Sequence, residues 1–189
     1  MKVFKCFFDI EKEEKWLNKQ LQNGFRCTNI SGLGIYTFEK TDKRYVMRLD
    51  YQDYLPKDKY EDYKLMYEDY GWSCIKGSQR GLQYWQKEAD EQNELYSDRQ
   101  SESNYYKRLM NYTSGLTIMT LLFSYMFVYK DSSLYLTEGL WSMKGSLFWK
   151  AFLFETPFAL LRSCPALLTI FFASSFYKAY RKYLKLKIQ

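Results

Sequence analysis

The longest uncharged stretch of the chain sets the strongest constraint on its fold. Between Arg108 and Lys130 lie 21 residues, 109–129, without a single charged side chain. A helix needs about 20 mostly apolar residues to cross the hydrocarbon core of a bilayer. A buried core helix would share the apolar composition, but the cations and tyrosines that flank this stretch are typical of membrane interfaces. The pattern therefore predicts a first transmembrane helix over residues 109–129.

A second apolar stretch follows, and charged residues and prolines interrupt it. Phe, Leu and Ala dominate residues 148–177. The interruptions are Glu155, Pro157, Arg162 and Pro165. This pattern favours a second transmembrane helix over residues 156–177, preceded by an extracytoplasmic loop, 130–155, that holds an interfacial helix rich in Trp and Phe.

The positive charges gather beside these two stretches. Residues 1–100 carry 17 Lys and Arg against 18 Asp and Glu, whereas residues 101–189 carry 11 against 4. Because cations near a span favour the cytoplasmic side, we expect a multi-pass protein of the cytoplasmic membrane with both termini in the cytoplasm and a basic tail, 178–189. The cations expected to contact anionic lipid headgroups are Lys107, Arg108, Lys178, Arg181, Lys182, Lys185 and Lys187. The near-neutral N-terminal part argues against direct binding of nucleic acid.

The first 90 residues have the pattern of a doubled unit. Each half has a β-prone run, a helical stretch, a glycine that stops the helix, an aromatic residue and a glycine-broken β segment. At an offset of 47 positions Trp16 matches Tyr63, Gly24 matches Gly71, Cys27 matches Cys74 and Gly34 matches Gly81. Two βαβ units of this kind predict an α+β domain with a ferredoxin-like sheet over residues 1–90. The polar residues 91–108 predict a helical connector to the membrane, with a flexible linker as the alternative.

No group of residues in the chain forms a catalytic constellation. The sequence has no histidine, which removes the commonest general base and the commonest metal ligand. The Gly32-Leu33-Gly34 stretch has no helix start after it, which indicates a turn between strands and not a nucleotide loop. The four cysteines show no C-x-x-C spacing and are interpreted as reduced thiols: Cys6, Cys27, Cys74 and Cys164. We therefore predict no catalytic residue, no metal ion and no cofactor.

Two charged residues at the second span form a candidate intramembrane interaction site. Glu155 and Arg162 lie seven positions apart and so share one face of a helix. A charge within a membrane is costly and usually faces protein or water, so these residues would contact a partner helix or a polar substrate. The alternative is structural: Arg162 extends to the interface or pairs with Glu155.

Short motifs in the first hundred residues carry a family resemblance. They are Lys2-Val3-Phe4-Lys5, Phe7-Phe8-Asp9, Glu14-Lys15-Trp16-Leu17-Asn18, Gly24-Phe25, Tyr36-Thr37-Phe38-Glu39 and Arg48-Leu49-Asp50. Together they resemble the bacterial DUF2812 family, whose members are often described as membrane proteins or linked with PadR-type transcriptional regulators. The resemblance implies a role near transcriptional responses to membrane stress. The winged-helix segment of such regulators has no visible counterpart in this sequence, so direct DNA binding is not expected.

These features favour a non-enzymatic sensor or adaptor that relays a membrane signal to a cytoplasmic protein, such as a transcriptional or stress-response regulator. The rival hypothesis is an accessory subunit of a membrane transporter, for example an exporter of peptides or drugs. An enzyme acting on lipids is a third hypothesis, in which carboxylates or tyrosines would supply the general base. The expected partners are membrane lipid and either a protein, a transport subunit or a regulator, or a second copy of the chain.

Overall fold

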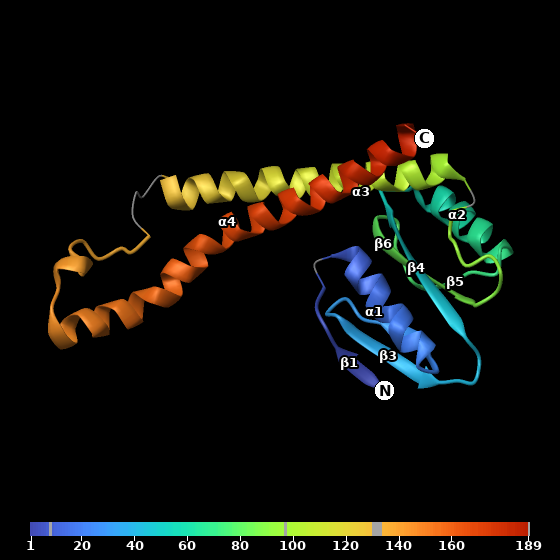
Figure 1. The fold of residues 1–189 in the computed structure, drawn as a ribbon, viewed down its shortest axis with the longest axis horizontal. Helices are drawn as coiled ribbons and strands as arrows, with labels where there is room; N and C mark the ends of the chain where they lie inside the picture. Colours follow the sequence, from blue (N-terminus) through green and yellow to red (C-terminus); the bar gives the residue numbers. More distant parts are fainter. Residues whose placement is uncertain (8, 97, 130–133, 189) are drawn as a thin grey trace. The chain divides into compact units, whose positions relative to one another are not determined.

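The computed structural model describes residues 1–7, 9–96, 98–129 and 134–188, and the chain divides into two compact units, 1–108 and 109–188. The first unit contains β1 (Lys2–Phe4), α1 (Ile10–Gln22), β2 (Phe25–Ile30), β3 (Ile35–Lys40), β4 (Tyr45–Gln52), α2 (Lys57–Asp69), β5 (Ser73–Lys76) and β6 (Gly81–Glu88). Helix α3 (Arg99–Ser124) carries residues of both units. The second unit continues with the π-helix η1 (Tyr125–Tyr129), the 3-10 helix η2 (Leu140–Ser142) and α4 (Gly145–Ile188) (Figure 1).

The duplication in the first unit holds at the level of strand register. Helices α1 and α2 are each 13 residues long and begin 47 positions apart. In β2 and β3 Cys27 pairs with Phe38, and the equivalent Cys74 and Trp85 pair in β5 and β6. Both hairpins shift register directly after this cysteine. The glycines that stop α1 and α2 have matching positive φ angles, 80° at Gly24 and 83° at Gly71, which a residue without Cβ adopts readily.

The strand order differs from the ferredoxin-like sheet expected from the sequence, which is not confirmed. Each half forms its own three-stranded antiparallel sheet, with orders β1-β3-β2 and β4-β6-β5. The repeating unit is therefore βαββ and not βαβ. The physical reason lies in the short turn between the last two strands of each half, which favours a local antiparallel hairpin, and the first strand then adds to that hairpin's free edge.

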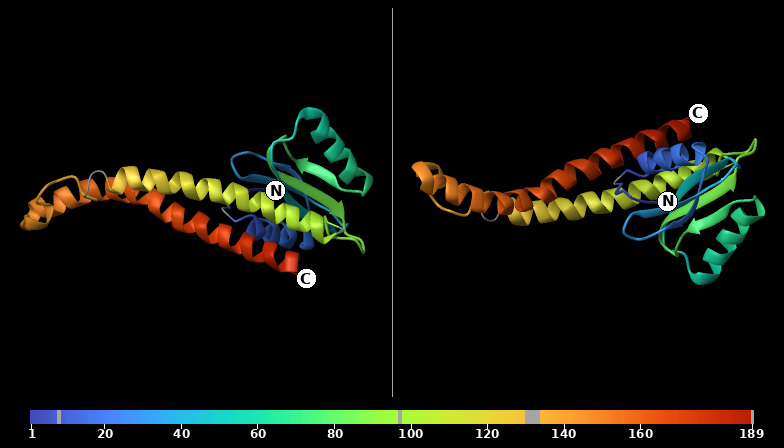
Figure 2. Two further views of the ribbon diagram at one scale, coloured as in Figure 1. Left: turned by 90° about the horizontal axis from the view of Figure 1, so that it is seen from above. Right: turned by 90° about the horizontal axis from the view of Figure 1, so that it is seen from below.

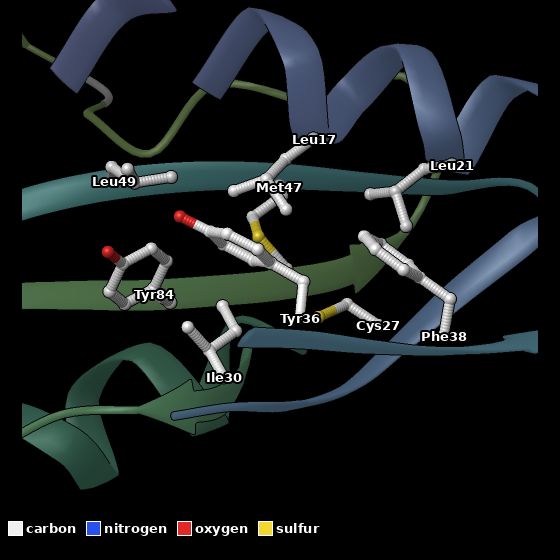
Figure 3. Packing of buried hydrophobic residues seen from close by; sticks show 9 residues of the cluster. All are labelled: Leu17, Leu21, Cys27, Ile30, Tyr36, Phe38, Met47, Leu49 and Tyr84. Carbon is white, nitrogen blue, oxygen red and sulfur yellow. The ribbon is translucent and has the colours of Figure 1, made fainter. Parts of the chain in front are cut away.

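The main core of the first unit lies between the two sheets and α1. Leu17 and Leu21 of α1 point toward Tyr36 and Phe38 on β3 and toward Met47 on β4 (Figure 3). Burying each such aliphatic or aromatic side chain stabilises the fold by about 1.5–3 kcal/mol. Asp9 fixes the start of α1, because its carboxylate accepts hydrogen bonds from the backbone N–H groups of Glu11 and Lys12 at 3.0 and 3.2 Å.

A second core packs α2 against the other sheet. Trp85 on β6 is fully buried, and its ring lies 4.9 Å from that of Tyr67 on α2. Trp72 and Leu95 complete the buried part of this cluster. The second core is thus largely aromatic, and it lies on the face of its sheet opposite to the main core.

In the second unit, the structure supports one membrane-crossing helix and not two. Among the described residues, α4 alone is long and apolar enough to cross a membrane. The first predicted span, 109–129, is divided between α3 and η1. Its hydroxyl side chains lower its apolar character, and several of them donate back to the helix, as Thr113 does to the carbonyl of Leu109 at 2.8 Å.

Helix α4 is longer than predicted and has no separate parts. The expected interfacial helix, the second span and the described part of the basic tail form one helix, Gly145–Ile188, of 44 residues. At 1.5 Å per residue it is about 66 Å long, roughly twice the thickness of a hydrocarbon core. Pro157 and Pro165 lie inside it, and the helix bends along its length (Figure 2). Residues 130–133 of the predicted loop and Gln189 of the predicted tail lie outside the described residues.

A candidate relay site around Asp50

Asp50 is a fully buried carboxylate at the centre of the first unit. Side chains alternate along β4, so Met47 and Leu49 face the main core while Asp50 faces the opposite side of the sheet. On that side it meets side chains from α2 and α3 and from the segment between β6 and α3. A buried carboxylate is unfavourable unless hydrogen bonds or a cation compensate it.

Four side chains donate hydrogen bonds to this carboxylate. Its Oδ1 accepts from the Tyr96 hydroxyl at 2.6 Å and from Arg108 Nη2 at 2.9 Å. Its Oδ2 accepts from the Tyr63 hydroxyl at 2.8 Å and from Gln52 Nε2 at 2.5 Å. We define the relay site as Asp50, Gln52, Tyr63, Tyr96 and Arg108. The set combines one charged and three neutral donors, which satisfies both carboxylate oxygens.

A second layer of hydrogen bonds holds two of the donors in place. Trp85 Nε1 donates to the hydroxyl of Tyr63 at 3.0 Å, which orients the tyrosine. Arg108 Nε donates to the backbone carbonyl of Tyr51 at 2.7 Å, so the guanidinium binds the same strand at two points. This double attachment holds Arg108, the last residue of the first unit, against β4.

Electrostatics keep the tyrosines neutral and the arginine charged. Burial raises the pKa of Tyr96, and the negative charge of Asp50 raises it further. Tyr63 has a raised pKa for the same two reasons. Burial by itself would lower the pKa of Arg108, but the charge and hydrogen bond of Asp50, together with the neighbouring tyrosines, raise it overall. The site is therefore a buried ion pair with neutral donors, a structure suited to holding two elements together and not to moving protons.

Helix α1 fixes the strand that carries the site. The Glu14 carboxylate binds Arg48 Nη1 at 3.2 Å and accepts from the backbone N–H of Leu49 at 2.8 Å. Asn18, one turn later, donates to the carbonyl of Met47 and accepts from its N–H. The Glu14–Asn18 and Arg48–Asp50 motifs of the sequence thus interlock in space, and their role is to position β4.

A second buried carboxylate lies on the other side of the same sheet. Glu13 is 5% exposed, and its Oε1 accepts from the hydroxyls of Tyr36 and Tyr84 at 2.6 and 2.7 Å. The two tyrosines lie side by side between the sheets with their hydroxyls on the same side (Figure 3). Burial and the neighbouring Glu13 raise the pKa of both phenols. Since both donors are neutral tyrosines, this group has the character of a structural link between the two halves.

The structure gives Arg108, one of the predicted headgroup contacts, partners within the protein. Its guanidinium is bonded to Asp50 and to the Tyr51 carbonyl, and its side chain is 21% exposed, while the contact with lipid stays a prediction. The physical reason is the buried carboxylate, which requires a cation that the sequence pattern did not reveal. Lys107, the preceding residue of α3, is exposed, as the prediction of a headgroup contact requires.

Glu155 and Arg162 lie on α4, two helical turns apart, as predicted. Glu155 is 8% exposed and accepts from the backbone N–H groups of Leu136 and Thr137 at 3.1 and 3.3 Å, and also from the Thr137 hydroxyl. The carboxylate therefore anchors the segment before η2. The predicted contact of Arg162 with a partner helix or a polar substrate is not tested by the structure and stays a prediction.

The remaining cations lie in the last turns of α4. Because this part is helical, Lys178, Arg181, Lys182 and Lys185 have the spacing of one helix face. Lys187 lies over the ring of Tyr183, 5.7 Å from its centroid. These five residues lie within α4, and their contact with lipid headgroups stays a prediction.

Sequence reasoning missed Asp50 as a site residue. Its signal was an acidic residue in the middle of a strand whose neighbours, Leu49 and Tyr51, are both apolar. Such a residue either faces solvent on a half-exposed strand or is buried and paired, and the alternating pattern favours solvent. Its donors Tyr96 and Arg108 lie 46 and 58 positions away, so no local spacing predicts them.

Comparison with known proteins confirms the family resemblance. The model of the DUF2812 family, described as a protein of unknown function, matches residues 9–118. The match includes every residue of the relay site and ends within α3. No curated protein and no solved structure matches the chain. Since the matched region is more than half of the sequence, the chain belongs to the DUF2812 family.

Proposed function

We propose that this protein is a non-enzymatic adaptor anchored in the cytoplasmic membrane, which relays a change in the membrane to a cytoplasmic partner. The observation that carries the proposal is the bond between Arg108 and Asp50. It joins a helix that continues into the apolar stretch from residue 109 onward to the fully buried centre of the folded unit. A displacement of that helix would act first on this bond.

The exposed apolar surface of the second unit supports membrane anchoring. Only 6% of the most apolar stretch of α4 is buried, whereas a core helix of a soluble protein would be mostly buried. The large apolar side chains that α4 exposes include Leu153, Phe154, Phe158, Leu160, Leu161, Leu167 and Ile170. A patch of this extent is suited to lipid.

The arrangement of charges supports a two-pass topology with both ends in the cytoplasm. Lys178 lies 23 residues after Glu155 on the same helix, a rise of about 35 Å, which fits one bilayer core with its interfaces. Arg162 would then lie about 10 Å inside the outer interface, within reach of headgroups for a long side chain. In this proposal the uncharged residues 109–129 would form the other crossing, although α4 alone among the described helices has the length and apolar composition of a span.

The relay would work as a two-state device in which the Arg108–Asp50 bond is made or broken. Removing one partner of a buried ion pair costs about 3–5 kcal/mol. A difference of this size changes the equilibrium constant between two states by roughly two to four orders of magnitude, close to the 5.5 kcal/mol or so of a full switch. Tyr63 and Tyr96 would move with the Asp50 carboxylate to which they donate. Helix α2 would move as well, because it carries Tyr63. The exposed side of α2 would present the change to a partner.

The test is to isolate the full chain from its native membrane in mild detergent and identify bound proteins by mass spectrometry. We expect a cytoplasmic protein whose capture changes several-fold in Arg108→Lys, which keeps the charge but loses the fork of donors. Lys107→Arg, at the adjacent exposed position, is the matched control and should capture the wild-type amount. Unchanged capture in Arg108→Lys would contradict a relay through this bond.

The same experiment separates the rival function, an accessory subunit of a transporter. The observation that favours this rival is Arg162, a charged residue in the candidate membrane helix. Stoichiometric membrane subunits, lost in Arg162→Leu and retained in Arg108→Lys, would support it. Recovery of the chain alone, as a defined oligomer, would indicate a self-assembling membrane protein.

A further inference from the structure

One face of the first sheet carries apolar side chains that the chain leaves exposed. On β1 Lys2 and Phe4 lie on the same face, and the register sets Phe4 opposite Ile35 on β3. Phe4 is 72% exposed and Ile35 36%, and Leu33, in the turn before β3, is 80% exposed. This turn lies against the end of β1, since Lys5 N donates to the Gly34 carbonyl at 2.9 Å. Phe4, Leu33 and Ile35 thus form one apolar ridge.

The second repeat shows the same positions in a buried setting. At the offset of 47, Lys2 corresponds to Leu49, Phe4 to Tyr51 and Ile35 to Leu82. Leu49 and Tyr51 are 3% and 5% exposed, and Leu82 packs against the main core.

The duplicated fold therefore covers this face once, in the second sheet. In the first sheet no other element of the described chain covers the corresponding face, which carries the exposed Phe4 and Ile35. Internal packing does not account for the ridge, and exposed apolar groups of this kind mark interaction sites.

Lysines lie near the apolar ridge. Lys2 extends from the same sheet face as Phe4. Lys5, the next residue after Phe4, turns to the α1 side, where its Nζ lies 4.9 Å from the centroid of the Trp16 ring. Lys76 reaches the same turn from β5: its Nζ donates to the Ser31 carbonyl at 3.1 Å and lies 5.7 Å from the centroid of the Tyr84 ring. Across the described ranges, none of these three lysines forms an ion pair within 4.0 Å. The carboxylate further along β3, Glu39, is paired with Arg26 at 3.3 Å. Lys2 therefore gives the apolar face a positive charge of its own, and Lys76 adds a second one beside the turn that carries Leu33.

We infer that the apolar ridge docks on the anionic surface of the lipid bilayer. Apolar side chains that enter the headgroup region, with lysines around them at the level of the phosphates, are the pattern of a peripheral membrane contact. A second copy of the chain fits less well, because a symmetric contact would place the lysines of both copies against each other. The inference rests on the proposed membrane anchoring, since a tethered unit meets the bilayer at high effective concentration.

The experiment compares hydrogen exchange of the full chain in two kinds of nanodisc, one of phosphatidylcholine alone and one that also contains phosphatidylglycerol. Flotation with liposomes of the same compositions measures anchoring separately. We expect peptides that cover residues 1–5 and 31–35 to exchange several-fold more slowly in the anionic discs. Peptides from α2 should exchange equally in both and report that the fold is intact.

Two double variants test the two parts of the surface. Lys2→Gln with Lys76→Gln should abolish the difference between the lipids, and Lys2→Arg with Lys76→Arg should keep it. Phe4→Ser with Leu33→Ser should remove the protection itself. The matched control is Leu65→Ser with Met66→Ser, which changes two exposed apolar residues of α2 (56% and 47%) and should leave residues 31–35 protected.

Each other outcome overturns the inference in a distinct way. Equal exchange of residues 31–35 in both lipids, with normal flotation, would exclude the lipid contact while membrane anchoring stands. Protection that persists in detergent without lipid would assign the ridge to a second copy. Loss of flotation by the wild-type chain would remove the membrane anchoring on which both proposals depend.

Discussion

The guanidinium of Arg108 lies 2.9 Å from the carboxylate of Asp50, across 58 positions of the sequence. The bond ties the first turns of α3 to the middle of β4. Asp50 has no exposed side-chain surface, so its charge depends on the donors around it. Arg108 is the one cation among them.

The variant Arg108→Met should destabilise the first unit strongly, because it leaves the charge of Asp50 buried and uncompensated. We expect a loss of about 3 kcal/mol in the free energy of unfolding, the lower end of the range for such pairs, since the arginine side chain remains 21% exposed. Urea unfolding followed by tryptophan fluorescence measures it. Lys107→Met, next along the same helix and exposed, should change the same quantity by less than about 0.5 kcal/mol. Equal effects of the two variants would show that the ion pair carries no stability.

Alkaline pH should destabilise the folded state through its buried tyrosines. The pKa of Tyr63 and of Tyr96 is raised above the ordinary value, by burial and by Asp50. Above pH about 10 the unfolded chain loses phenolic protons that the folded chain retains, so stability falls as pH rises from there, whereas below it the contribution is complete. Unfolding measured across alkaline pH should have a shallower slope in Tyr96→Phe. A slope equal to that of the wild type would contradict this account.

The sequence predicts the elements of the first unit better than their pairing. The offset that matches Gly24 with Gly71 also matches the helix bounds and the bulges, because glycine stops and apolar spacing are local properties. The strand order depends on which edges meet, and for β1 this is decided by contacts with β3, more than thirty positions away. The relay site is more difficult to predict than the strand order, because the sequence around Asp50 does not indicate that Arg108, 58 positions away, will compensate its charge.

Two glycines of one turn should respond oppositely to the same substitution. Gly34 has a φ of 76°, and a Cβ there would lie 2.6 Å from the Lys5 carbonyl oxygen. Gly32 has no atom within 4 Å of the corresponding position. Gly34→Ala should therefore cost about 1–3 kcal/mol in the free energy of unfolding, and Gly32→Ala should be neutral or slightly stabilising. Thermal unfolding of the two variants measures the difference, and equal melting temperatures would contradict the geometry of the turn.

Thiol labelling should distinguish a buried cysteine from an exposed one. Burial raises the pKa of Cys27 to about 12, so at neutral pH it is both inaccessible and protonated. Cys6 is exposed. Maleimide should modify Cys6 rapidly and Cys27 only on unfolding, as read from peptide masses. Labelling of Cys27 at the rate of Cys6 would show that the main core opens readily.

Cys164 offers a direct test of the membrane assignment of α4. It is exposed in the chain by itself, yet it lies two residues after Arg162 in the candidate membrane helix. A water-soluble maleimide should label it in mild denaturant and much more slowly in liposomes, where lipid covers the helix. Cys6 in the same sample is the control and should react in both. Rapid labelling of Cys164 in liposomes would place this part of α4 in water.

Glu155 should control the fold of the segment before η2. Its carboxylate accepts two backbone N–H groups, from Leu136 and Thr137, which would otherwise lack these bonds. Glu155→Leu should therefore release this segment, because hydrogen bonds to a charged group contribute about 1.5–3 kcal/mol each. Limited proteolysis in detergent should then cut residues 134–139 several-fold faster. The matched control is Glu138→Leu, which changes an exposed carboxylate of the same segment that accepts neither of these two N–H groups. If Glu138→Leu accelerated the cleavage as much as Glu155→Leu does, the added apolar side chain and not the lost anchor would explain the effect.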